Sequence, residues 1–334
     1  MRILYTGPFR TASITKSRGQ ALIALGHEVV VVDQAPYLHR GSHVLWKAQV
    51  HLLIGPGIIA YNRDIVKRAR EYKPELIYID QGTYLWPETV VALRSTGARL
   101  VHYTSEYFGY REYWYRHLFR AVHLYDAHVI TNVLNKPVLE EKGATRIIVT
   151  EFGYDPALHR PQWLTPEERS RYQSDTLFVG HWEPTTEQMI VRLRESGILV
   201  KVWGQGWKKA RRLKDRKLIG RIPLEEYFKA LAATKIGLCF LSKWNRNRSA
   251  GRTFEIPAVG RFLLAERTPD HLSYFEEGKE AEYFSSSEEL VEKARYYLVH
   301  DDEREAIARA GHERCLTSGY THQDRVKQIM EAIA

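Results

Sequence analysis

A chain of 334 residues, 44% hydrophobic and 27% charged, is too apolar to be disordered and long enough for two domains. Its net charge of +9 leaves anionic small molecules, nucleic acids and anionic membranes open as partners, but no apolar run approaches the roughly 20 residues of a membrane-spanning helix, and the N-terminus lacks a signal peptide's apolar centre. Two cysteines, Cys239 and Cys315, are too few for a disulfide framework or a zinc site, so we expect a cytoplasmic protein.

In chain order, the first half alternates short apolar strands with amphipathic helices. The segment Glu28–Asp33 (EVVVVD) is almost entirely β-branched, as expected of a strand covered on both faces. Such alternation predicts right-handed crossovers and a parallel sheet. We predict strands at residues 2–6, 28–33, 76–80, 99–103, 127–131 and 147–150, and helices at 14–25, 58–72, 86–95, 112–124 and 136–142.

The alternation pauses at residues 152–165, where Gly153, Pro156 and Pro161 predict a linker. It then resumes, so the chain reads as an N-terminal domain over 1–155, a C-terminal domain over 156–320 and a last helix over 321–334. We predict strands at 177–179, 199–203, 235–241 and 262–265, and helices at 186–196, 224–233, 253–259, 288–299, 302–315 and 322–333.

The loop after the first strand excludes a dinucleotide-binding fingerprint. It reads Thr6-Gly7-Pro8-Phe9, with one glycine where the fingerprint needs three, and no phosphate-binding loop of the G-x-x-x-x-G-K-[ST] type occurs in the chain. The two Rossmann-like halves must therefore serve another ligand.

Several motifs resemble the GT-B glycosyltransferases, and most closely the CgeB-like branch of the "glycosyl transferases group 1" sequences. These motifs are ALIALGHEVVVV at 21–32, FGYDP at 152–156, VGHWEP at 179–184, VWGQGW at 202–207 and the stretch 252–284. The resemblance implies an α/β fold of two doubly wound Rossmann-like domains facing across a cleft, with the last helix crossing back to the first domain. It also implies transfer of a sugar from a nucleotide-diphosphate donor, bound on the second domain, to an acceptor, bound on the first.

The resemblance places the donor site at strand ends and at one helix N-terminus of the second domain. Glycines after strands let a backbone approach a ligand, and a helix N-terminus attracts a diphosphate, although ordinary turns also use such glycines. Arg252 would meet the diphosphate and Glu255 the ribose hydroxyls, with an intrahelical Arg–Glu pair as the alternative. The predicted donor-binding residues are Gly180, Glu183, Trp203, Gly204, Ser249, Arg252, Thr253 and Glu255.

This chain departs from the retaining relatives in two ways. Their E-x7-E motif keeps its second acid here as Glu255, but Asn247 replaces the first acid. No D-x-D motif is present, since Asp301-Asp302 reads as a helix cap, so we expect a diphosphate site without metal or other cofactor.

Two residues are candidates for the chemistry itself. Glu106 follows the strand at 99–103 and suits a general base or acceptor anchor, with a helix N-cap acid as the alternative. His181 would touch the diphosphate or sugar, or is structural. Gly7 and Tyr107 are predicted on the acceptor side, which would take a glycan, a glycolipid or a small molecule.

Two further segments bear on partners. The aromatic and arginine-rich segment 107–125 suits sugar stacking, a membrane interface or core packing, and the basic segment 208–217 is either a solvated face or a binding patch. Together they predict peripheral attraction to the inner face of a membrane. A nucleotide-sugar epimerase, a basic nucleic-acid-binding protein and an inactive nucleotide-sugar scaffold are the alternatives, but no recognised nucleic-acid module is visible, so no nucleic acid is expected as a partner. The donor base and sugar, the acceptor, the stereochemistry and the oligomeric state stay open.

Overall fold

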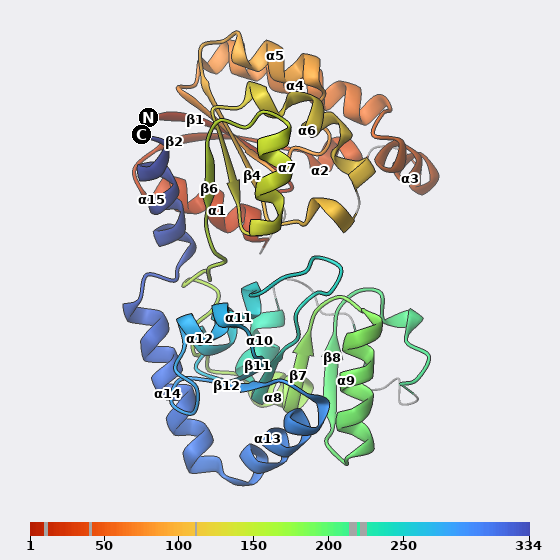
Figure 1. Cartoon of the computed structure of the whole chain (residues 1–334), viewed down its shortest axis with the longest axis vertical. Coiled ribbons are helices and arrows are strands. Elements are labelled where there is room, and N and C mark those ends of the chain that lie inside the picture. Colours follow the sequence, from red (N-terminus) through yellow and green to blue (C-terminus); the bar gives the residue numbers. More distant parts are fainter. Residues whose placement is uncertain (10–12, 40–41, 111, 214–218, 221–225) are drawn as a thin grey trace. The chain divides into compact units, whose positions relative to one another are not determined.

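The computed structural model describes residues 1–9, 13–39, 42–110, 112–213, 219–220 and 226–334, and these divide into two compact units. Unit 1 comprises Met1–Glu151 with His322–Ala334, and unit 2 comprises Phe152–Thr321. Each unit is built on a parallel six-stranded sheet flanked by helices (Figure 1). The predicted α/β architecture of two doubly wound Rossmann-like domains is therefore confirmed.

The sheet of unit 1 has the strand order β2-β1-β3-β4-β5-β6, so the order reverses between β1 and β3. In open parallel sheets ligands bind at the carboxyl ends of the strands that flank such a reversal. The strands are β1 (Arg2–Gly7), β2 (Glu28–Asp33), β3 (Leu76–Asp80), β4 (Arg99–Thr104), β5 (Ala127–Ile130) and β6 (Ile147–Val149).

The helices of unit 1 include one from the far end of the sequence. α15 (His322–Ile333) lies against α1 (Ile14–Ala24), and its Val326, Ile329 and Ile333 join the core that α1 forms with the sheet (Figure 1). The other helices are α2 (Ala35–Leu38), α3 (His43–Leu52), α4 (Pro56–Tyr72), α5 (Pro87–Arg94), α6 (Arg116–Ala121), α7 (Lys136–Glu141) and the 3-10 helices η1 (Phe108–Tyr110), η2 (Glu112–Tyr115), η3 (Val122–Leu124) and η4 (Val133–Asn135).

The sheet of unit 2 has the strand order β12-β11-β10-β7-β8-β9, which reverses between β7 and β10. Its strands are β7 (Ser174–Val179), β8 (Val200–Trp203), β9 (Ile219–Gly220), β10 (Thr234–Cys239), β11 (Phe262–Glu266) and β12 (Glu282–Phe284). Its helices are α8 (Pro166–Tyr172), α9 (Pro184–Glu195), η5 (Trp207–Lys209), α10 (Tyr227–Ala232), α11 (Gly251–Ala258), α12 (Pro269–Tyr274), α13 (Ser287–Val299) and α14 (Asp301–Thr317).

Several segments differ from the sequence predictions. The helix expected over 112–124 is instead η2, α6 and η3 in succession, because this segment turns to bury Phe108 and Tyr115 against each other, with ring centroids 4.7 Å apart. No element was predicted for α2, α3, α8, β9, α12 or β12. Within the basic segment 208–217, Lys208 and Lys209 belong to η5, and residues 214–217 lie outside the described part of the chain.

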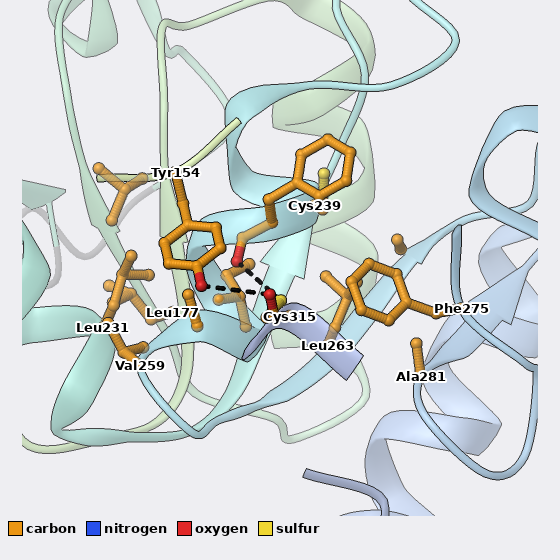
Figure 2. Packing of buried hydrophobic residues seen from close by; sticks show 14 of the residues in the cluster. Tyr154, Leu177, Leu231, Cys239, Val259, Leu263, Phe275, Ala281 and Cys315 are labelled. Carbon is orange, nitrogen blue, oxygen red and sulfur yellow. Dashed lines mark hydrogen bonds between the residues drawn. The ribbon is translucent and has the colours of Figure 1, made fainter. Parts of the chain in front are cut away.

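Both cysteines are buried, unpaired thiols in one of the cores of unit 2 (Figure 2). Cys315 lies on α14, where its carbonyl oxygen accepts a hydrogen bond of 3.2 Å from the hydroxyl of Tyr154. Burial raises the pKa of Cys239 to about 12 and that of Cys315 well above its ordinary value. Neither thiol therefore has the thiolate character that a nucleophile or a metal ligand needs.

A buried pair of histidines links the two neighbouring strands β4 and β5. His102 and His128 are in register, and their Nδ1 atoms lie 3.1 Å apart. Each ring also contacts a backbone carbonyl through Nε2, of Gln81 and Val122 respectively. Burial lowers the pKa of His102 to about 3, with a smaller contribution from His128, and burial lowers that of His128 to about 4.

Because of these two histidines, we expect the free energy of unfolding of unit 1 to fall in mild acid. Since their folded pKa values lie below the ordinary value, they contribute stability above about pH 6.5 that falls as the pH falls toward 4, by up to about 2 kcal/mol each at pH 5. Melting curves between pH 7.5 and 5 should show this fall. It should be smaller in His128→Gln and unchanged in His123→Gln, which alters an exposed histidine of the same unit. Parallel pH profiles for all three proteins would contradict the assignment.

Candidate functional site

The reversal between β7 and β10 gathers several predicted donor-site residues at the carboxyl end of β7. Gly180 follows β7 directly, and Arg252 reaches the same place from the first turn of α11, where its Nε donates to the carbonyl of Val179 at 3.1 Å. A guanidinium and a helix N-terminus at a strand end offer positive charge and N–H donors to an anion. This end of the sheet has the chemistry expected of a diphosphate site.

The glycine-bearing loops after β7 and β8 are pressed against each other. The amide of Gly180 donates to the carbonyl of Trp203 at 2.9 Å, and Trp207 donates through Nε1 to the carbonyl of Gly180 at 2.9 Å. A Cβ on Gly204 would lie 1.9 Å from the carbonyl oxygen of Gly180, and Gly204 has φ of +152°, so only glycine fits there. Packing between the loops is therefore sufficient reason for Gly204.

Glu183, a predicted donor-binding residue, holds two loops together in the structure. Its carboxylate is buried and accepts hydrogen bonds from the hydroxyl of Ser242 at 2.5 Å and from the amide of Lys243 at 2.9 Å. These bonds tie the loop after β7 to the loop after β10 across the reversal of strand order. In this conformation the protein's own donors use both carboxylate oxygens, so we assign Glu183 to positioning the loops rather than to binding the donor.

Four mostly buried side chains from three separate parts of the sequence meet around α11. Arg252 and Glu255 form an ion pair three residues apart, and Arg252 also lies over the ring of Tyr227, 4.5 Å from its centroid. His159, within the predicted linker 152–165, places Nε2 3.9 Å from Oε1 of Glu255 and also contacts the hydroxyl of Tyr227. We call these four residues the α11 network.

Burial dominates the electrostatics of the α11 network. The side chain of Glu255 is only 1% exposed and that of Arg252 is 23% exposed. Burial and the nearby charge of Arg252 lower the pKa of His159 to about 3, so the imidazole is neutral at neutral pH. The ion pair is thus the intrahelical alternative weighed from the sequence, and ligand hydroxyls reach Glu255 only if Arg252 gives way.

Thr253 caps the N-terminus of α11, and Ser249 directly precedes the N-cap residue. Thr253 is fully buried, and its Oγ1 accepts from the amide of Ala250 at 3.1 Å and lies 2.8 Å from Nε2 of His271. Thr253 therefore caps the helix instead of facing a ligand, which differs from the prediction. Ser249 is also buried, one residue before the N-cap Ala250.

Two other predicted residues of unit 2 lie at the edge of this group. His181 is exposed in the loop after β7. Trp203 is half-buried at the end of β8, its ring centroid is 6.2 Å from that of Tyr172, and its Nε1 has no hydrogen-bond partner among the described residues. The sequence analysis missed Trp182 and Trp244, whose rings meet edge to face with centroids 6.2 Å apart on the loops after β7 and β10. The presence of a tryptophan in each of these two loops was the signal in the sequence that could have identified them.

In unit 1, Glu106 and Tyr107 follow β4 in a loop that a buried asparagine holds in place. Asn135, at the end of η4, donates to the carbonyl of Glu106 at 2.7 Å and accepts from the amide of Phe108 at 3.0 Å. The hydroxyl of Thr104 accepts from the amide of Glu106 at 3.2 Å. The backbone of Glu106 is thus fixed at a strand end, as a general base requires, and sequence reasoning did not identify Asn135.

The reversal between β1 and β3 holds Gly7 beside a buried ion pair. A Cβ on Gly7 would lie 2.9 Å from the Cβ of Asp80, at the end of β3. Asp80 accepts from Arg18 of α1 at 2.6 Å and from the hydroxyl of Tyr5 at 2.6 Å, and the guanidinium lies 3.9 Å from the ring centroid of Tyr103. Gly7 is therefore required for close packing, and this ion pair was not predicted.

A metal-binding group, a membrane-spanning helix or a surface hollow among the described residues would each indicate what the protein contacts. No group of three or more His, Cys, Asp or Glu residues suited to a metal is found in the described part of the chain. Within those same ranges no single helix meets the length and composition of a membrane span, although α3 and α4, bent by 64°, meet them as a pair. One open hollow of unit 1 is lined by His51, Glu112, Tyr113 and Trp114, and another lies between α4 and α5. Neither hollow contains a predicted site residue.

Comparison with known proteins gives a match over most of unit 2. Residues 183–331 match the family model described as glycosyl transferase-like, which confirms the predicted resemblance in this part of the chain. A comparison with curated protein sequences gave no match.

Solved structures resemble the chain over its whole length. Anabaena HepE in complex with UDP-glucose is 14% identical, with a TM-score of 0.67 and coverage of 100% of this chain and 99% of that chain. Sucrose-phosphate synthase from Thermosynechococcus elongatus is 10% identical, with a TM-score of 0.68 and coverage of 99% and 97%. A UDP-N-acetylglucosamine 2-epimerase is 15% identical, with a TM-score of 0.55 and coverage of 99% and 94%. At these identities the likeness shows the fold, which is GT-B.

Proposed function

Because the second unit is glycosyl transferase-like and the chain has the GT-B fold, we propose that the protein is a glycosyltransferase that moves a sugar from a nucleotide-diphosphate donor to an acceptor. The observation that carries this proposal is the match of residues 183–331, which begins at Glu183, the last residue of the loop after β7, and includes Arg252 and Glu255. The reversal of strand order between β7 and β10 supports the same placement of the donor.

In the proposed donor complex, Arg252, Glu255 and Glu106 bind the diphosphate, the ribose and the proton of the acceptor, respectively. Arg252 and the first amides of α11 receive the diphosphate, and the negative charge that develops on the leaving nucleotide is stabilised by the same groups. Glu255, as a carboxylate with two acceptor oxygens, receives the ribose hydroxyls once Arg252 turns toward the diphosphate. Glu106 of unit 1 accepts the proton of the attacking acceptor hydroxyl. His181, Trp203 and Ser249 are proposed to contact the donor, and Tyr107 the acceptor.

Binding of a nucleotide sugar should raise the melting temperature. A ligand that binds only the folded state adds about 2.7 kcal/mol at 100 times its Kd, and 1 kcal/mol moves the melting temperature of a domain of this size by about 2–4 °C. A thermal-shift screen with UDP, GDP, dTDP, CMP and their sugars, without added metal and with EDTA, measures this. No shift with any nucleotide would contradict the proposal.

The structural likeness to an epimerase makes epimerisation the second outcome to separate. With a nucleotide sugar that shifts the melting temperature, a transferase releases the nucleoside diphosphate and extends an acceptor, which is a glycan, glycolipid or small molecule. An epimerase changes the configuration of the sugar, so product analysis by NMR distinguishes the two reactions. Release of the nucleoside diphosphate, with the transferred sugar unchanged at every carbon other than the anomeric one, supports transfer.

The setting of the reaction is also a proposal. We place the protein in the cytoplasm because its two cysteines are buried and unbridged, as in proteins of reducing compartments. Attraction to the inner face of a membrane is supported by the net charge of +9 and by four exposed cations of the basic segment, Lys208, Lys209, Arg211 and Arg212. Nucleic acid is not proposed as a partner.

A further inference from the structure

Most residues of the helix α3 of unit 1 are exposed, apolar ones included, and its one buried residue is polar. Its polar Gln49 is buried, where the side-chain amide donates to the carbonyl of Leu38 at 2.6 Å and accepts from the amide of Gly57 at 3.1 Å. Its apolar Val44, Leu45 and Leu52 are exposed, with Val44 76% exposed. A surface helix normally buries its apolar side chains and presents polar ones to water.

The exposed apolar area continues past the end of α3. Ile54, in the turn between α3 and α4, is exposed, and so is Ile59 in the first turns of α4. We call Val44, Leu45, Leu52, Ile54 and Ile59 the α3 surface. Exposed apolar side chains concentrated in one short segment of the chain are typical of a contact site for another molecule or a membrane.

The chain segment around the α3 surface is basic, although Glu112 lines the same hollow as His51. The sequence between Asp33 and Asp64 contains no acidic residue. Exposed His43, Lys47 and His51 lie on α3 itself, and Arg116 donates to the carbonyl of Leu52. An apolar area with a cationic border is complementary to the anionic headgroups and acyl chains of a bilayer.

Aromatic side chains flank the same surface. Trp46 stacks on both His39 and His43, with ring centroids 5.5 and 5.1 Å apart. Tyr113 is exposed beside His51, with centroids 6.3 Å apart, and lines the open hollow described above. Tryptophan and tyrosine favour the level of the headgroups, where one end of the ring is apolar and the other is hydrated.

We propose that the α3 surface binds anionic lipid bilayers. Its five apolar side chains enter the boundary between headgroups and acyl chains, and His43, Lys47 and His51 lie at the level of the phosphates. The inference rests on the membrane attraction stated under the proposed function but assigns it to α3, a segment outside both 107–125 and 208–217. It does not depend on sugar transfer.

The test measures binding to vesicles of phosphatidylcholine with 30% phosphatidylglycerol, by flotation, against vesicles of phosphatidylcholine alone. Val44→Glu is expected to weaken binding to the anionic vesicles ~10-fold or more. The substitution removes an apolar side chain that enters the bilayer, and it adds a negative charge that the anionic headgroups repel. The matched control is Val299→Glu, which alters a valine of unit 2 that is 74% exposed. This control should bind as the unchanged protein does, and binding should fall as salt rises.

Several outcomes overturn the proposal. Equal binding by Val44→Glu and Val299→Glu, or no binding by the unchanged protein at low salt, removes the lipid contact from α3. Loss of binding in Lys208→Glu/Lys209→Glu, with Val44→Glu unaffected, places the contact on the basic segment. Self-association detected by light scattering, abolished by Val44→Glu and unaffected by lipid, would mean that a second copy covers the surface. The nucleotide-induced thermal shift of Val44→Glu is read separately, so loss of vesicle binding with an intact shift leaves the proposed transferase standing.

Discussion

Glu106→Gln is expected to lower the rate of sugar transfer ~10²–10⁴-fold, the usual cost of losing a general base. The glutamine keeps the size of the side chain but accepts no proton. The loop itself should keep its conformation, since Asn135 and Thr104 hold the backbone of residues 106–108 rather than the carboxylate. Donor binding on unit 2 should be unchanged, so the loss should fall on kcat, measured as nucleoside diphosphate release with acceptor present.

The control for this variant is Glu88→Gln on α5 of the same unit, where the side chain is 73% exposed. It removes the same charge away from the end of β4 and should leave kcat unchanged. If Glu106→Gln turns over at a rate close to that of the unchanged protein, Glu106 is an acid near a strand end with no part in proton transfer.

Glu255→Gln is expected to weaken nucleotide binding roughly 10–100-fold, the effect of losing hydrogen bonds to a charged group. The neutral amide accepts the ribose hydroxyls less strongly. It also leaves the charge of Arg252 without its carboxylate in the free protein. Some loss of thermal stability should therefore accompany the loss of affinity, because Glu255 is buried and paired. Isothermal titration with the nucleotide identified by thermal shift measures the affinity.

A second ion pair of unit 2 provides a control that distinguishes an effect on stability from an effect on nucleotide binding. Arg304 is buried and pairs with Asp301 at 2.5 Å, also three residues apart on a helix. Asp301→Asn should lower the melting temperature without changing nucleotide affinity. If Arg252→Ala and Glu255→Gln both keep the affinity of the unchanged protein, the α11 network is structural and the donor binds elsewhere.

Strands were predictable from the sequence where their residues are mostly β-branched or apolar, whether the strand is fully buried, as Leu76–Asp80 is, or only partly buried at the sheet edge, as Glu28–Asp33 is. Segments such as Glu28–Asp33 and Leu76–Asp80 contain mostly β-branched and apolar residues, and neither helix periodicity nor turn residues compete with that pattern. The α3 helix was missed for the opposite reason. Its apolar residues face outward and its buried residue is Gln49, so a reading that takes apolar residues as core residues finds no consistent face.

Site residues were predictable by place but less well by role. The reversal of strand order does bring Gly180 and Arg252 together, as parallel strands that share an edge require. The sequence could not show that Ser242 and Lys243 would use the carboxylate of Glu183, because that contact spans 59 residues and depends on which strands are neighbours. The pair of Arg18 and Asp80 was hidden for the same reason, since a helix near the N-terminus meets a strand 62 residues later.

Because both thiols are buried in unit 2, their chemical labelling can measure how often the core of that unit becomes exposed to solvent. Cys239 and Cys315 lie in the core of that unit, and the sequence of unit 1 contains no cysteine (Figure 2). A thiol reagent therefore modifies the native protein only when unit 2 exposes its interior, so the labelling rate measures the free energy of that fluctuation. Mass spectrometry that resolves single and double labelling would show whether α14 detaches from α11 and β11 before the sheet opens. Slower labelling on addition of a nucleotide would register binding without any assay of transfer.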